Sequence, residues 1–409
     1  MRSIVIGAGY AGLAAATRLA AAGRSVTVLE ARARVGGRAW SEALENGVVV
    51  ERGAEYIFPG EHAVRALAAE YGIPIVSHGV TYERRTLEGR RLSWSELLAA
   101  EQRVRDAAAV VAAERPDASV QDAFVSAFGA DHRRHPYFRR FATSVAADPA
   151  EVGVQALLGE GHGELIDDGG RLHGGNQSLA VAMAASLGEA VRLSTPVAGI
   201  RLSASDVTAV TAAGESIVGD ELVIAVPLPL VRELDIGFPL PPAIDRALAR
   251  RGMGDATKCS VALREDVGDP AVQSAEEFSW SWQSLDVSGA VRVPALTGFT
   301  GGGSAARYAG PGGAGRWLDD VTALRGPLRT SGEVLVTAWR DDPWTQGAYS
   351  HPLPGWDRGD IAVFDELIGG RVTFAGEFIS TAASLDGAAS SGVDAAHRLL
   401  RAHGVSATS

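Results

Sequence analysis

Residues 3–23 read SIVIGAGYAGLAAATRLAAAG, and this stretch decides the fold. Its first residues, 3–6, form a short apolar run typical of a buried strand, and its second half is an alanine-rich run that suits a helix. Between them the glycines have the spacing Gly7-x-Gly9-x-x-Gly12. A strand, a glycine-rich turn and a helix in this order predict a βαβ unit whose helix N-terminus holds a pyrophosphate.

Each glycine has its own task in such a turn. Gly7 permits the tight turn, Gly9 lets a pyrophosphate approach the backbone, and Gly12 lets the helix and the strand pack closely. The next strand ends at Glu30, where a carboxylate can hold two ribose hydroxyls and disfavours the 2′-phosphate of NADP. The motif therefore predicts a Rossmann-like dinucleotide site. A glycine-rich turn without a ligand is the alternative.

A second cluster of glycine and arginine, RVGGR at residues 34–38, follows almost at once. A nicotinamide dinucleotide needs no such cluster after its ribose acid. FAD brings a pyrophosphate, a ribityl chain and a flavin ring that must all be held. Paired glycines let the backbone pass close to the cofactor, and Arg38 can neutralise phosphate charge with a planar fork of donors. This cluster favours FAD over a surface turn with solvated arginines.

Composition limits the class of protein. A chain of 409 residues is long enough for two domains. The formal net charge of −11 argues against nucleic acid or an anionic membrane as a partner. The single cysteine, Cys259, excludes an internal disulfide and a cysteine-based metal cluster. No stretch approaches the ~20 apolar residues that a membrane helix needs, so we expect a cytoplasmic protein without a metal.

The pattern changes along the chain. From His62 to about Leu158 it becomes helical, and Ser93 with Glu96 forms a capping box before a long amphipathic run. Short β-rich runs follow in residues 191–226 and suggest a return to the cofactor domain. The sequence predicts an α/β fold, with a Rossmann-like FAD-binding domain and an interleaved α+β substrate-binding domain of mixed sheet plus helices. The predicted FAD-binding domain is 1–61, 170–240 and 330–409, and the predicted substrate-binding domain is 62–169 and 241–329.

Blocks over the whole chain resemble the flavin amine oxidase family, which includes monoamine oxidases, polyamine oxidases and L-amino acid oxidases. The nucleotide turn and VTVLEARARVGGRAWS look like the family's opening block. VVVERGAEYI looks like the segment that passes under the flavin, with Glu51 in place of the family's aspartate. The further blocks are RLHGGNQSLAVAMAASLG, VRLSTPVAGI, RGMGDATKCSVAL, WRDDPWTQGAYSHPLPG and FAGEFISTAASLDGAASSG, in the family's order.

The resemblance implies FAD contacts at matching positions. Val197 would face the adenine end, and Glu377 could bond ribityl or phosphate-linked oxygens. A helix beginning near Leu385 would point its N-terminal end at the N1 and O2 edge of the flavin, where it would stabilise negative charge. The full set of implied cofactor residues is Gly7, Gly9, Ala11, Gly12, Glu30, Ala31, Gly37, Arg38, Gly53, Ala54, Glu55, Val197, Glu377 and Leu385.

Lys258 is the catalytic candidate. In the resembled family, a lysine in a KC or KV strand holds a water against flavin N5. An ammonium there would help the reaction with O2, and a neutral lysine could accept a proton. The alternative is a strand lysine that extends to solvent. Cys259 should lie on the opposite face of the strand, in the core.

The departures from the family pattern bear on the cofactor link and the substrate. Ala348 stands where monoamine oxidases have the cysteine that binds FAD covalently, so we expect non-covalent FAD. Of the family's two substrate-caging tyrosines, Tyr349 matches the first and Ser384 takes the place of the second, which argues against a small arylalkylamine. Glu55 and Tyr56 replace an arginine that binds substrate carboxylates, which argues against a simple α-amino acid. Glu55 would either attract a cationic amine or be a second-shell or solvent-facing acid, and Tyr56, Tyr349 and Ser384 are the predicted substrate contacts.

The main functional hypothesis is an FAD-dependent oxidase of an amine C–N bond. A hydride would pass to flavin N5, the imine would hydrolyse, and O2 would become H2O2. The alternative is an FAD-dependent C–C desaturase or dehydrogenase of the same fold. Lys258 favours the amine oxidase, and it also argues against a protein that keeps FAD only for structure.

Overall fold

The computed structural model describes residues 1–79, 85–87, 90–91, 93–158, 169–267, 271–274, 277, 279–283 and 291–405. Its helices are α1 Tyr10–Ala21, α2 His62–Glu70, α3 Trp94–Glu114, α4 Val120–Phe128, α5 Pro136–Val145, α6 Gln177–Leu187, α7 Leu228–Glu233, α8 Pro242–Ala249, α9 Gly313–Arg325, α10 Gly359–Ala362 and α11 Leu385–Ala402.

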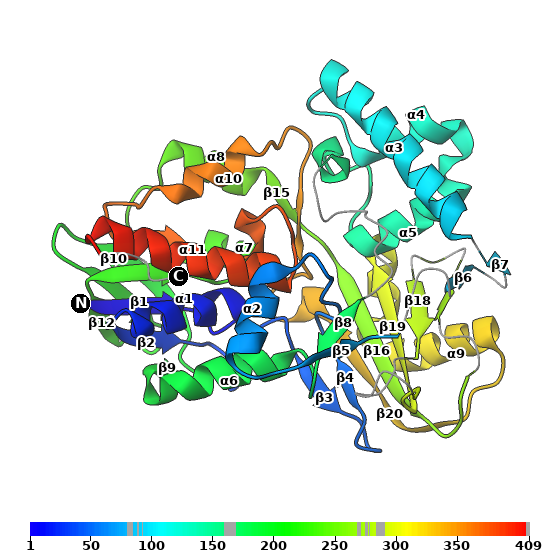
Figure 1. Ribbon diagram of the computed structural model, residues 1–409, viewed down its shortest axis with the longest axis horizontal. Helices are drawn as coiled ribbons and strands as arrows, with labels where there is room; N and C mark the ends of the chain where they lie inside the picture. The colour runs from blue at the N-terminus through cyan, green and yellow to red at the C-terminus, as the bar shows by residue number, and fades with distance from the viewer. Residues whose placement is uncertain are drawn as a thin grey trace.

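A parallel sheet forms the centre of the left part of Figure 1. Its order is β22 (Val372–Phe374), β13 (Glu221–Ile224), β1 (Arg2–Ile6), β2 (Ser25–Leu29) and β9 (Val191–Arg192). Every neighbouring pair is parallel. This is the arrangement that the strand–turn–helix motif predicts.

The side chains of these strands enter different cores on the two faces of the sheet. Val5 and Val28 pack with Leu13 of α1 and Leu399 of α11, and these two helices lie against each other. On the opposite face, Ile4 packs against a second sheet. That sheet has the order β12 (Ser216–Gly219), β11 (Val207–Thr211), β10 (Val197–Leu202) and β14 (Asp235–Ile236). Helices, parallel sheet and second sheet therefore stack as successive layers.

A mixed sheet lies in the right part of Figure 1. Its order is β20 (Thr330–Ala338), β16 (Ala256–Leu263), β19 (Ala295–Gly301), β18 (Ser279–Trp282), β17 (Ala271–Gln273), β6 (Arg85–Leu87) and β7 (Arg90–Arg91). Trp317 of α9 packs against Cys259 and Val261 of β16, so Cys259 is a core residue, as predicted. Helices α3, α4 and α5 share a core of their own at the top right.

Short paired strands complete the fold. They are β3 (Ser41–Ala43) with β4 (Val49–Glu51), β5 (Ile75–Ser77) with β8 (Gly170–Leu172), and β15 (Arg251–Met253) with β21 (Ser350–Pro352). All three pairs are antiparallel. The segment after β4 carries several candidate site residues, and pairing with β3 fixes where it begins.

The predicted α/β class, with a parallel sheet and a mixed sheet plus helices, is confirmed. The capping box at Ser93 and Glu96 is present at the start of α3. The prediction of helix throughout His62 to Leu158 is wrong for residues 75–77, 85–87 and 90–91, which form β5, β6 and β7, and it lies outside the described residues at 80–84 and 88–89. The β-branched run IVS forms hydrogen bonds with β8, a pairing distant in sequence that helical periodicity does not report.

The domain division stays a prediction. Two segments near its boundaries pack across it. Val64 and Leu67 of α2 belong to the core of the parallel sheet. Strand β20 pairs with β16 of the mixed sheet.

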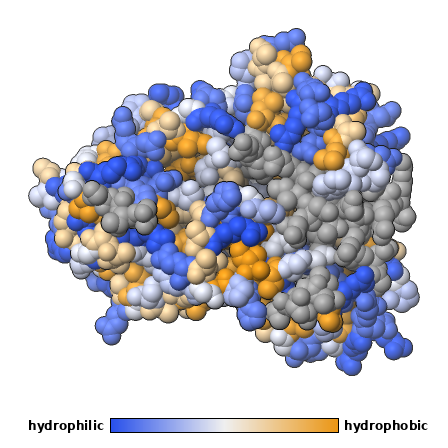
Figure 2. Space-filling model, viewed as in Figure 1, coloured by the Kyte–Doolittle hydropathy of each residue, from blue (hydrophilic) through white to orange (hydrophobic). Residues whose placement is uncertain are grey.

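The face shown in Figure 2 carries hydrophobic side chains in several separate groups among hydrophilic ones. No helix in the described part of the chain is long and apolar enough to cross a membrane.

Candidate functional site

A cavity of about 980 Å³ is lined by residues of both the parallel and the mixed sheet. Ile6 and Leu29, at the carboxyl ends of β1 and β2, line one part of it. Lys258 of β16 and Trp282 of β18 line another. Ligands of open α/β sheets bind at the carboxyl ends of the parallel strands, so this cavity is the candidate site.

The N-terminus of α1 opens on the cavity. Gly7 has a φ of +103°, a conformation that favours glycine, and Gly9 is the N-cap without a side-chain cap. A Cβ added at Gly9 would meet nothing within 4 Å, whereas one at Gly12 would lie 1.9 Å from the Gly7 carbonyl oxygen. The first turn of α1 contains no acid. An uncapped helix N-terminus with backbone access fits a pyrophosphate.

Glu30 lies beside this turn. It is 6% exposed, and its Oε2 accepts the Ala8 N–H at 2.7 Å while Oε1 accepts the Arg32 N–H at 2.9 Å. Burial raises the pKa of Glu30, and these two backbone bonds oppose that effect. Each carboxylate oxygen keeps a second lone pair, so the group can still accept from ribose hydroxyls.

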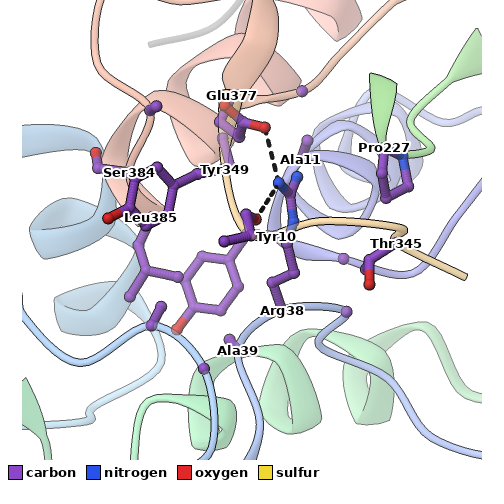
Figure 3. A pocket seen from close by; sticks show the side chains of 18 of the residues that line it. Tyr10, Ala11, Arg38, Ala39, Pro227, Thr345, Tyr349, Glu377, Ser384 and Leu385 are labelled. Atoms are coloured by element: carbon purple, nitrogen blue, oxygen red, sulfur yellow. Dashed lines mark hydrogen bonds and ion pairs between the residues drawn. The ribbon is translucent and has the colours of Figure 1, made fainter. Parts of the chain in front are cut away.

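Arg38 and Glu377 form an ion pair in the middle of the cavity (Figure 3). Arg38 Nη1 donates to Glu377 Oε1 at 2.8 Å and to the Ala348 carbonyl at 2.7 Å. Glu377 Oε2 accepts the Ser350 hydroxyl at 2.6 Å. Burial alone would raise the pKa of Glu377, but Arg38 and Ser350 outweigh it, and the pKa lies below its usual value. The pair fixes Arg38 at the place where phosphate charge is predicted.

The start of α11 lies on the side of Arg38 opposite to Pro227 and Thr345 in Figure 3. Ser384 is the N-cap of this helix, and its side chain accepts the Gly387 N–H at 3.2 Å. Leu385, the first helical residue, also lines the cavity. The N-terminal end of α11 therefore faces the cavity, and its position at the N1 and O2 edge of a flavin stays a prediction.

Lys258 is buried and charge-paired. It is 2% exposed, so the alternative of a lysine that extends to solvent is wrong. Its Nζ donates to the Gly53 carbonyl at 2.9 Å and to Glu55 Oε2. The Glu55 side chain is 8% exposed, which excludes a solvent-facing acid, and its other oxygen lies 2.6 Å from His78 Nε2.

The charges around Glu55 set its protonation. Burial alone would raise the pKa of Glu55, but Lys258 and the bond from His78 outweigh burial and lower it to about 2. Burial lowers the pKa of His78 against the opposing effect of Glu55. Nearby Glu51 accepts from Ser41 and Asn176, and burial together with the Glu55 charge raises its pKa to about 7.

Aromatic rings surround the Lys258 end of the cavity. Trp280 and Trp282 stack with centroids 4.1 Å apart, and Tyr56 stacks on Trp280 at 6.2 Å. Phe299 also lines this end, and Tyr349 donates its hydroxyl to the Ser144 carbonyl. Within the described part of the chain, the buried Trp282 indole N–H has no hydrogen-bond partner, so a ligand atom can accept from it.

Sequence reasoning found a part of the cavity lining. Of the predicted site residues, all but Gly12 line the cavity, and Gly12 packs α1 on β1 instead. The lining members are Gly7, Gly9, Ala11, Glu30, Ala31, Gly37, Arg38, Gly53, Ala54, Glu55, Tyr56, Val197, Lys258, Tyr349, Glu377, Ser384 and Leu385. It missed Trp280, Trp282, Phe299 and the Glu55 partner His78, although the aromatic run FSWSW was a visible signal for the two tryptophans.

A metal does not fit the described residues. No group of three or more His, Cys, Asp or Glu side chains among them could hold one. The uncapped helix N-terminus, the buried Glu30 carboxylate and the Arg38 cation instead fit a dinucleotide.

This fold and this cavity, with an uncapped helix N-terminus at one end and aromatic rings at the other, fit an enzyme that uses a dinucleotide cofactor. The sequence profile of the family described as flavin containing amine oxidoreductase matches residues 10–400. The chain therefore belongs to the flavin-containing amine oxidoreductase family and is a flavin-dependent enzyme that acts on amines.

Curated relatives differ in how much they share. An L-amino acid dehydrogenase of Synechocystis sp. is 24% identical over 97% of this chain and 94% of its own length. A putrescine oxidase of Kocuria rosea is 48% identical, but over 20% of this chain and 16% of its own length. The human lysine-specific histone demethylase 2 is 26% identical over 91% of this chain and 50% of its own length.

Solved structures show the same fold. Cyclohexylamine oxidase from Brevibacterium oxydans has a TM-score of 0.82 at 22% identity, with 98% of both chains covered. A putrescine oxidase bound to putrescine has a TM-score of 0.80 at 21% identity, with 98% of this chain and 99% of that chain covered. At this identity the likeness extends to the fold and no further.

Proposed function

We propose that the protein is an FAD-dependent oxidase of a small-molecule amine, with O2 as the electron acceptor and H2O2 as a product. The observation that carries this proposal is one cavity that joins the uncapped α1 turn to buried Lys258. FAD, when bound, would supply the hydride acceptor and the route of the electron pair to O2. The amine would become an imine, which water would hydrolyse.

The chain's own residues divide between the two ends of this cavity. Gly9 and Arg38 would hold the pyrophosphate, Glu30 the ribose, and Val197 the adenine end. Ala348 offers no sulfur for a thioether, so the cofactor is bound without a covalent link. The N-terminal end of α11, at Leu385, would stabilise negative charge on the flavin ring.

The aromatic end would receive the amine. Tyr56, Trp280 and Trp282 exclude water and offer apolar contact area. Burial among these rings disfavours the charged form of a bound amine, so the amine loses its proton more readily. A neutral amine is the form that can release a hydride. Neither putrescine nor cyclohexylamine, which the solved relatives are named for, is assigned as the substrate.

The second candidate is an amine dehydrogenase that passes electrons to an acceptor other than O2. The relative named L-amino acid dehydrogenase, which aligns over nearly its whole length, favours it. The C–C desaturase and the cytoplasmic location stay hypotheses from the sequence.

The proposal is tested by mixing the purified protein anaerobically with amines and then admitting air. We expect an amine to bleach the flavin absorbance, and air to restore it with one H2O2 per amine oxidised. Bleaching without recovery in air, but with recovery on adding a quinone, would reject the oxidase in favour of the dehydrogenase.

Acid precipitation should release all of the flavin into the supernatant. Ala348, which lies at the predicted attachment point, contributes its carbonyl to Arg38 and has no nucleophilic side chain. The measurement is the visible absorbance of the washed pellet and of the supernatant. A yellow pellet would contradict non-covalent binding.

A further inference from the structure

Lys258 is held by acceptors on one segment, the turn that follows β4. The Gly53 carbonyl and the Glu55 carboxylate each accept from its Nζ. An ammonium has three N–H donors. Among the hydrogen bonds of the described residues, these are the two that Lys258 makes, and one N–H remains for a ligand in the cavity that Lys258 lines.

His78 fixes the other oxygen of Glu55. Its Nε2 lies 2.6 Å from Glu55 Oε1, and the side chain is fully buried. The pKa of Glu55 is low and the pKa of His78 is lowered by burial, so an ionised carboxylate accepts from a neutral imidazole. The backbone N–H of His78 donates to the Gly169 carbonyl at 2.8 Å, which anchors this residue next to the start of β8.

We infer that Glu55, fixed by His78, is a positioning residue that keeps Lys258 as an ammonium with one N–H left for the flavin site. This inference rests on the proposed function, which places the flavin beside Lys258. Burial disfavours a charged amine strongly unless an anion is in contact with it. Glu55 supplies that anion, and the bond from His78 keeps the carboxylate from rotating away.

No other charged group near Lys258, Glu55 and His78 takes the role of Glu55 within the described part of the chain. The charge of Glu51 interacts with the charges of Glu55 and Lys258. The hydrogen bonds that the Glu51 oxygens accept, however, come from Ser41 and Asn176. The positive charge of Arg171, on β8, helps to lower the pKa of His78. Glu55 is therefore the carboxylate in direct contact with the Lys258 ammonium within the described part of the chain.

The test compares Glu55→Gln, Lys258→Met and the double variant after reduction with dithionite. Wild-type reoxidation by O2 should keep its rate into the alkaline range. In Glu55→Gln the rate should fall at a pH lower by about one unit or more, because the buried amine loses its proton without its anion. At alkaline pH the Glu55→Gln variant and the double variant should be reoxidised equally slowly. The flavin midpoint potentials of these two variants should also be equal.

Variants of His78 provide a second test, in which Glu55 and Lys258 both stay in place. His78→Gln keeps a donor for Glu55 and should retain the wild-type pH profile, whereas His78→Leu should shift it in the direction of Glu55→Gln. Glu101→Gln, which removes a buried carboxylate of α3 outside the cavity, is the matched control and should leave the profile unchanged. Unshifted profiles in both Glu55→Gln and His78→Leu would overturn the inference. So would additive effects of Glu55→Gln and Lys258→Met, because Glu55 would then act independently of Lys258.

These measurements need no amine. A protein that no amine reduces, but whose dithionite-reduced form shows the predicted pH shift, would reject the proposed function and support the inference. If an amine reduces the protein but the pH profiles of these variants are not shifted, the proposed function is supported and the inference is rejected. If O2 is not the acceptor, the flavin midpoint potentials of the variants take the place of the reoxidation rates in deciding between these outcomes.

Discussion

Lys258→Met should retain FAD but slow the reaction of the reduced protein with O2 by about tenfold to a thousandfold. That range corresponds to ~1.4–4 kcal/mol for the loss of one oriented charge from a transition state. Reduction by the amine should change modestly, because Lys258 is not proposed to accept the hydride. The measurement is stopped-flow mixing of the reduced variant with oxygenated buffer.

The structure requires a matched variant for this experiment. Lys258→Met leaves Glu55 buried with His78 as its hydrogen-bond partner, and breaking a buried ion pair costs roughly 3–5 kcal/mol of folding free energy. The double variant Lys258→Met with Glu55→Gln removes both charges and should recover much of that stability. Wild-type reoxidation rates in a folded, FAD-containing double variant would remove Lys258 from the mechanism.

Glu30→Ala should weaken FAD binding by about tenfold to a hundredfold, because hydrogen bonds to charged groups contribute roughly 1.5–3 kcal/mol each. Glu30 also accepts the backbone N–H groups of Ala8 and Arg32, so the variant loosens the turn that receives the cofactor. Glu30→Gln, which keeps one acceptor, is the control and should lose less. FAD release is measured by fluorescence during dialysis, and full flavin occupancy in Glu30→Ala would reject the ribose assignment.

Arg38→Ala should lose FAD as well, but the loss of affinity is mixed with a loss of stability. The sequence predicts little change in fold for this variant. The structure instead pairs Arg38 with Glu377, which is 4% exposed and would be left as a buried anion beside Ser350. Arg38→Lys, which keeps the charge but loses the planar fork, separates the two effects.

Local sequence signals predicted several local features of the fold well. The glycines of the first turn, the strand end at Glu30 and the capping box of α3 each depend on residues close together in the chain. Such features are fixed by backbone conformation and short-range hydrogen bonds. The helical prediction failed for residues 75–77 and 85–87 because β5 and β6 exist through pairing with β8 and β17, which are distant in sequence.

The contacts among Lys258, Glu55 and His78 show that pairings distant in sequence also escape prediction at the candidate site. The sequence places Lys258 on a strand and Glu55 after a turn, but not in contact, and it gives no sign of His78. Three elements from distant parts of the chain bring these side chains together in the folded protein. The possible role of Glu55 as the group that attracts a cationic amine is thereby weakened, because its carboxylate is already bonded to a cation.

The central claim is that an amine reduces the flavin of this protein, and the most direct measurement is anaerobic bleaching of its visible absorbance. The panel comprises polyamines, amino acids, arylamines and cyclic amines, each compared with the same amine deuterated at the carbon next to nitrogen. We predict that at least one amine bleaches the absorbance, and that its deuterated form does so more slowly because hydride leaves that carbon. A protein that dithionite bleaches, but that stays yellow with every amine in the panel, would contradict the account.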